Sequence, residues 1–163
     1  MFLPAVLAMK KPKFSIAQKD ERLGELVHKT DHKTLARWAL DCAERVMPYF
    51  ERAYPDDPRP RRALETLQAW LDTGVFKMAV IRAASLGSHA AARAVGEDNP
   101  ARSAARAAGQ AVATAHVITH APGAAIYALQ AIHRASDAAD AEAAIARERE
   151  WQYNRLLELR SEG

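Results

Sequence analysis

Residues 99–121 read NPARSAARAAGQAVATAHVITHA, and this alanine-rich segment decides the fold. Asn99 is a favourable helix N-cap, and Pro100 suits the first helical position because a proline there loses no helical hydrogen bond. Apolar residues recur at helical spacing, and all but one are alanine: Ala104, Ala107, Ala108, Ala111, Ala115 and Ile118. Side chains that end at Cβ let helix axes approach closely. We therefore predict one helix across this segment, lying deep against its neighbours.

A second alanine-rich segment, at residues 77–95, has the same pattern. Small residues such as Ala84 and Ala91 share one side of the predicted helix, while Arg82 and Arg93 lie on the other. The short connection to the next segment begins with Gly96, a residue typical of helix ends. We expect the two helices to form an antiparallel hairpin at the centre of the protein.

The composition of the 163-residue chain favours helices throughout. Hydrophobic residues make up 49% of it but aromatic residues only 7%, because alanine supplies much of the apolar share. No segment alternates like a strand. We predict an all-α, compact bundle of six or seven helices, with a partly ordered N-terminal extension at residues 1–30 and a single helical domain at residues 31–163.

Polar residues and prolines mark the predicted boundaries of the other elements. An irregular lead-in at residues 1–12 precedes a short helix at residues 15–29. Thr30 or Asp31 caps the next helix, and Pro48 kinks or restarts it. Pro122 and Gly123 break the central helix, so a further helix runs over residues 124–135. The last helix begins at Asp137.

Cysteine content and hydropathy bear on where the protein acts. Cys42 is the only cysteine, so no disulfide forms within the chain, and we expect a cytoplasmic protein with a buried thiol. No apolar run approaches the roughly 20 residues of a membrane span. The apolar start, MFLPAVLAM, lacks the basic region and cleavage site of a signal peptide.

Seven basic residues on the two alanine-rich helices form a candidate partner-binding stripe. An acidic protein surface or a phosphate would suit it, although a solvated helix face has the same pattern. The stripe comprises Arg82, His89, Arg93, Arg102, Arg106, His116 and His120. A net charge of +3 is compatible with an acidic partner but too small to indicate nucleic acid.

Three histidines of the stripe suggest an alternative, a metal-dependent enzyme. His116 and His120 are spaced i, i+4, which places two imidazoles on one helix face, and His89 is available from the neighbouring helix. Carboxylate companions are missing, so we predict no metal, no cofactor and no catalytic residue. A second alternative is a weak nucleic-acid-binding helical protein, which would bind less tightly as salt rises.

One further polar group follows helical spacing. Arg37, Asp41 and Arg45 lie four residues apart, and we expect them to form an ion-pair ladder along one helix surface. An alternative is that Asp41 is partly buried beside Cys42 and Trp38.

Several blocks of the sequence resemble a bacterial family described as putative immunity proteins. The most specific are LARWALDCAERV at 35–46, PYFE at 48–51 and YPDDPRPR at 54–61, followed by AAGQA at 107–111, TAHV at 114–117 and HA at 120–121. The similarity covers about residues 31–160. It implies an all-helical cytoplasmic protein that protects its producer by binding a toxin, with no catalytic residues to carry over. We therefore favour a non-enzymatic module that neutralises a cognate toxin, with homo-oligomerisation left open.

Overall fold

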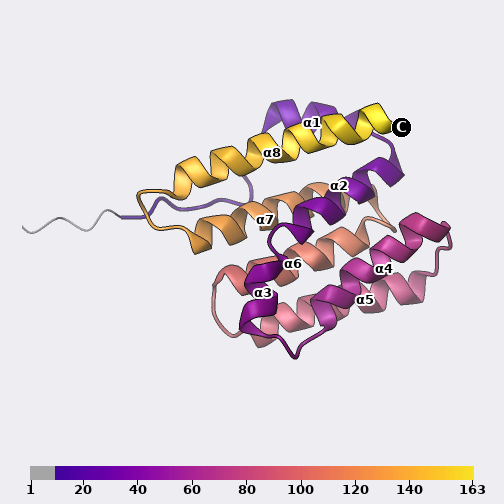
Figure 1. The fold of residues 1–163 in the computed structure, drawn as a ribbon, viewed down its shortest axis with the longest axis horizontal. Helices are drawn as coiled ribbons and strands as arrows, with labels where there is room; N and C mark the ends of the chain where they lie inside the picture. The colour runs from indigo at the N-terminus through magenta and orange to yellow at the C-terminus, as the bar shows by residue number, and fades with distance from the viewer. Residues whose placement is uncertain (1–9) are drawn as a thin grey trace, which may run out of the picture.

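The computed structural model describes residues 10–163, in which the chain forms eight α-helices, one short 3-10 helix and no strands (Figure 1). The predicted all-α bundle with a central hairpin is confirmed, with one or two helices more than expected. The first nine residues of the predicted lead-in lie outside the described residues. The elements are α1 (Glu21–His28), α2 (His32–Glu44), α3 (Met47–Ala53), α4 (Arg59–Thr73), α5 (Met78–Ala94), α6 (Pro100–Ala113), η1 (Ile118–His120), α7 (Ala121–Ala135) and α8 (Ala141–Glu162).

Side-chain caps begin the helices at several of the predicted positions. The Asp31 carboxylate accepts a hydrogen bond from the backbone N–H of Thr34 at 2.9 Å and caps α2. Asn99 caps α6 in the same way through the N–H of Arg102, also at 2.9 Å. Each bond satisfies a donor that has no partner inside the helix. Pro48 lies in the first turn of α3, so the chain restarts a helix there, as predicted.

Four predicted boundaries are wrong. The central helix ends at Ala113 rather than at residue 121, and several of the residues that follow are β-branched and favour a helix poorly. Pro122 does not break a helix but sits in the first turn of α7, where its missing donor costs nothing. Residues 137–140 form a turn, so α8 begins at Ala141. The helix expected over residues 15–29 begins only at Glu21, after the Asp20 cap.

Helix α6 lies at the centre of the bundle and contacts α2, α3, α4, α5 and α7 (Figure 1). Nine of its fourteen residues are buried. The facing helices supply the large side chains that its alanines lack, including the fully buried Trp38 of α2, Phe50 of α3 and Leu64 of α4. Large residues meeting small ones let α6 approach several neighbours at once while the core stays filled.

Ion pairs and hydrogen bonds tie α2 to the rest of the bundle, and the predicted ladder along its surface is wrong. Asp41 accepts from Arg155 of α8 at 2.8 Å, and Arg45 forms a two-pronged pair with the buried Glu148 of α8. Arg37 donates instead to Gln68 of α4 at 2.9 Å. These partners stand across helix interfaces, and loss of Arg45 would leave the buried carboxylate of Glu148 without a counter-charge, which is strongly destabilising.

Candidate functional site

The outer side of α5 exposes an unusual concentration of large apolar side chains. Met78 is 43% exposed and Leu86 is 55% exposed, and at 100° per residue these two share one side of the helix with Arg82 and Arg93. We call these four residues the α5 face. Exposed hydrophobic side chains that gather on one surface of a protein often mark a site of interaction with another molecule.

A hollow of about 310 Å³ lies between α4 and α5, on another side of α5 from this face. Trp70 and Ile81 form its floor, and the exposed Val75 and Val80 stand at its edge. Phe76, 43% exposed, lies on the segment that leads into α5. A shallow apolar hollow next to exposed aromatic and aliphatic groups suits the anchoring side chain of a protein partner.

The cations of the α5 face have no counter-charges. Residues 75–96 contain Lys77, Arg82 and Arg93 but no aspartate or glutamate. Neither Arg82 nor Arg93 forms an ion pair within residues 10–163, and both are exposed. Along α5 the two unpaired guanidinium groups alternate with Met78 and Leu86, and they are available to carboxylates on another molecule.

The remaining arginines of the predicted stripe are used inside the protein. Arg102 is half-buried, donates to the carbonyl of Ala92 at 3.1 Å and pairs with Asp98 at 2.9 Å. Arg106 donates to Nδ1 of His89 at 2.9 Å. The alanines of α6 are buried, so the stripe divides into an outer part on α5 and an inner part between the helices.

The His89 ring fills the space between α5 and α6. A Cβ added to Gly109 of α6 would lie 2.7 Å from its Nε2 atom, so the glycine is what admits the ring. Because a guanidinium only donates, Nδ1 must accept from Arg106 and the neutral ring carries its proton on Nε2. Burial, together with the charges of Arg106 and Arg93 and with His120, lowers the pKa of His89 to about 4. The ring is thus neutral at pH 7.

His116 and His120 do not form the predicted pair on one helix face, because α6 ends before either residue. His116 is exposed in the turn after α6 and stacks against Phe76, with ring centroids 6.2 Å apart. His120 ends η1 and donates from Nδ1 to Oε1 of Gln110 at 2.8 Å. Burial and the neighbouring His116 lower the pKa of His120. Among residues 10–163, no three His, Cys, Asp or Glu side chains are grouped so that they would hold a metal ion.

The prediction from sequence included Arg82 and Arg93 but missed the apolar members of this surface. Met78 is the first residue of α5 and comes before the first buried residue of the helix, Ile81. A signal was present, since Leu86 stands on the arginine side of the predicted helix. Its exposure depends on which side faces α4 and α6, and that is a property of the assembled bundle.

Comparisons with known proteins assign the chain to a family. The model of one family, described as Imm-5 like putative immunity protein, matches residues 25–159. No curated protein matches the chain. No solved structure matches it either. None of the helices in residues 10–163 has the length and apolar composition that crossing a membrane requires. The match spans most of the sequence, from α1 to the last turns of α8, and the chain belongs to the Imm-5-like putative immunity protein family.

Proposed function

We propose that the protein neutralises a cognate bacterial toxin by direct, non-enzymatic binding, and that the α5 face is the surface that contacts the toxin. The observation that carries the proposal is that Met78 and Leu86 are exposed on the same side of α5 as two arginines without ion pairs. Membership of an immunity protein family supports a toxin as the partner in general. We also place the protein in the cytoplasm, whose reducing environment suits its single, buried and free thiol at Cys42.

The chemistry of the face indicates what the toxin presents. Met78 and Leu86 would contact apolar side chains of the toxin, and Arg82 and Arg93 would pair with its carboxylates. Pairs of this kind accelerate encounter and select the partner, whereas the buried apolar contacts supply most of the affinity. The partner is therefore an acidic surface with apolar side chains.

The rigidity of the hairpin explains how such a face would inhibit without catalysis. Ser88 of α5 donates to the carbonyl of Ala105 at 2.7 Å, and Ser85 donates to that of Gly109 at 3.0 Å. These bonds fix α5 against α6 before any partner arrives. A preformed face loses little conformational entropy on binding, so it can cover a toxin's active site tightly.

Proteins encoded next to this chain's gene provide the test. Each is expressed in a recombinant host with and without the full-length protein, and growth is measured. We expect one neighbour to arrest growth alone and to be harmless with its partner, and the two purified proteins to form a complex by isothermal titration calorimetry. Rescue of growth without a complex would contradict direct binding.

Paired variants then test the face. Arg82→Glu with Arg93→Glu should weaken the complex by about 100-fold, as expected when two interface cations are reversed. The matched control is Arg147→Glu with Leu157→Asp on α8, where Leu157 is 42% exposed. The control should bind normally. Equal losses in both variants, or none in the first, would place the interface elsewhere.

A further inference from the structure

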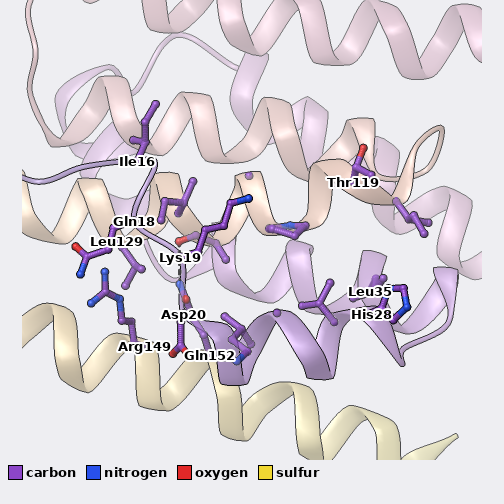
Figure 2. A pocket seen from close by; sticks show the side chains of 18 residues that line it. Ile16, Gln18, Lys19, Asp20, His28, Leu35, Thr119, Leu129, Arg149 and Gln152 are labelled. Atoms are coloured by element: carbon purple, nitrogen blue, oxygen red, sulfur yellow. Dashed lines mark hydrogen bonds between the residues drawn. The ribbon is translucent and has the colours of Figure 1, made fainter.

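A cavity of about 570 Å³ lies on a different part of the molecule from the α5 face (Figure 2). Its walls come from α1 and the segment before it, from η1 and from the facing sides of α7 and α8. Most of the lining is apolar, including Leu23 and Val27 of α1, Leu35 of α2, and Ile126 and Leu129 of α7. Its volume falls in the range of small-molecule sites, about 300–1,000 Å³.

One buried acceptor in the lining has no partner. Gln152 of α8 is fully buried, and its Nε2 donates to the carbonyl of Ala125 at 2.9 Å. That carbonyl only accepts, so the amide cannot turn over, and Oε1 must be the free atom. It is the one buried side-chain nitrogen or oxygen without a hydrogen bond among residues 10–163. Buried polar atoms nearly always find a partner, so this atom points to a missing donor.

Positive charge lies close to that acceptor. Arg149 precedes Gln152 by about one turn of α8, and both side chains extend from this helix toward the cavity that they line (Figure 2). Arg149 is half-buried but forms no ion pair within the described chain, whereas Lys19 is exposed and turns its nitrogen away from Arg149 (Figure 2). Asp20 is the only acid of the lining, and its carboxylate caps α1 by accepting from the N–H of Leu23. The polar end of the cavity therefore favours an anion.

We propose that this cavity binds a small amphiphilic carboxylate that carries a hydrogen-bond donor next to its anionic group, as an N-acyl amino acid does. The acyl chain lies between α1 and α7, the amide N–H donates to Oε1 of Gln152, and the carboxylate pairs with Arg149. The spacing fits, because side chains at i and i+3 on a helix begin about 5–6 Å apart.

The outer wall of the cavity permits entry. Helix α1 contains no buried residue and is tied to α8 by the exposed ion pair of Arg22 with Glu150 at 2.8 Å. A surface pair of this kind contributes little to stability. Displacing α1 would open the apolar interior while the α6 core stays intact.

The test uses a matched pair of probes on the full-length protein. N-decanoylglycine has the donor, and N-decanoyl-N-methylglycine has the same chain and carboxylate but no N–H. By calorimetry we expect the first to bind at least about tenfold more tightly, because only it satisfies the buried acceptor. N-decanoylglycinamide, which lacks the carboxylate, should also bind more weakly. Absence of binding at submillimolar N-decanoylglycine, or equal affinity for the first two probes, would overturn the proposal.

Variants separate the donor from the bulk of the added methyl group. Gln152→Met keeps the shape of the side chain and removes the acceptor, so the preference for the N–H probe should disappear. A preference that survives would reveal a steric effect and overturn the role of Gln152. Arg149→Gln lies nearer the surface and provides a second route if the first variant fails to fold. It should abolish the preference for the carboxylate while leaving that for the N–H intact.

Discussion

Helices α5 and α6 have similar compositions but opposite surroundings. Both are rich in alanine and carry two arginines each, yet nine of fourteen residues are buried in α6 and four of seventeen in α5. Helix α6 has neighbours on nearly every side, whereas α5 lies at the edge of the bundle against α4 and α6 (Figure 1). Alanine therefore allows close helix packing in α6, whereas in α5 many of the alanines lie on the outside of the bundle.

The arginines show the consequence of this difference. Arg102 donates to the carbonyl of Ala92 and Arg106 donates to His89, so both guanidinium groups hold α6 against α5. Arg82 and Arg93 point away from the bundle, and their charge remains for another molecule. The position of a helix within the bundle, more than its composition, separates structural from binding residues.

The largest expected effect comes from enlarging one alanine in each helix. Ala104 of α6 is fully buried, and Ala104→Leu should lower the free energy of unfolding by about 3 kcal/mol, because the surrounding helices leave no space for the added atoms. Ala83→Leu on the exposed side of α5 should change it by less than about 0.5 kcal/mol. Urea denaturation followed by circular dichroism measures both. Equal losses would mean that α5 is also covered.

The difference in burial between α5 and α6 could be predicted only in part from the sequence. Helix spacing and caps predicted the hairpin correctly, since Asn99 and Pro100 act through neighbours in the chain. Local signals failed between residues 114 and 123, where alanine-rich spacing suggested a continuing helix. Whether the chain turns there depends on how α7 docks against α2 and α6, and no single segment carries that information.

The candidate site shows the same division. Helical spacing placed Arg82 and Arg93 on one side of the predicted helix together with His89, but it did not decide which of these residues face solvent. The bond of Arg106 to His89 depends on Gly109 facing α5, which requires the register between two helices. The partners of Asp41 and Arg45 stand more than 100 residues away on α8, so helical spacing suggested nearer partners that the fold does not use.

His89 provides a second test of the difference between the two helices, because this ionisable side chain of α5 turns toward α6. Its pKa is about 4 in the folded protein and about 6.5 when the chain is unfolded. Between these pH values only the unfolded chain binds the proton, so stability falls as pH is lowered from about 6.5 to about 4. We expect a loss of about 2 kcal/mol, less than the full shift implies because the ring is partly exposed to solvent.

His89→Gln is the matched control for this pH dependence. Its side-chain oxygen can still accept from Arg106, but the group does not titrate. Other acids and bases are common to both proteins, so the difference between their stability curves from pH 7 to pH 4 isolates His89. The wild-type curve should be steeper. Parallel curves would show that the ring is not buried between the helices as the structure has it.

The smallest expected change in stability comes from replacing one glycine in each helix. A Cβ at Gly87 of α5 meets nothing within 4 Å, so Gly87→Ala should stabilise the protein by about 0.5–1 kcal/mol through better helix propensity. At Gly109 of α6 the same Cβ would displace the His89 ring and break its bond to Arg106, so Gly109→Ala should destabilise by about 1 kcal/mol despite the same gain in propensity. Adding His89→Ala should remove the penalty, because the two residues are then no longer coupled. If both glycine substitutions stabilise the protein equally, α5 and α6 do not meet through this contact, and the assignment of Arg106 to the interior of the hairpin fails with it.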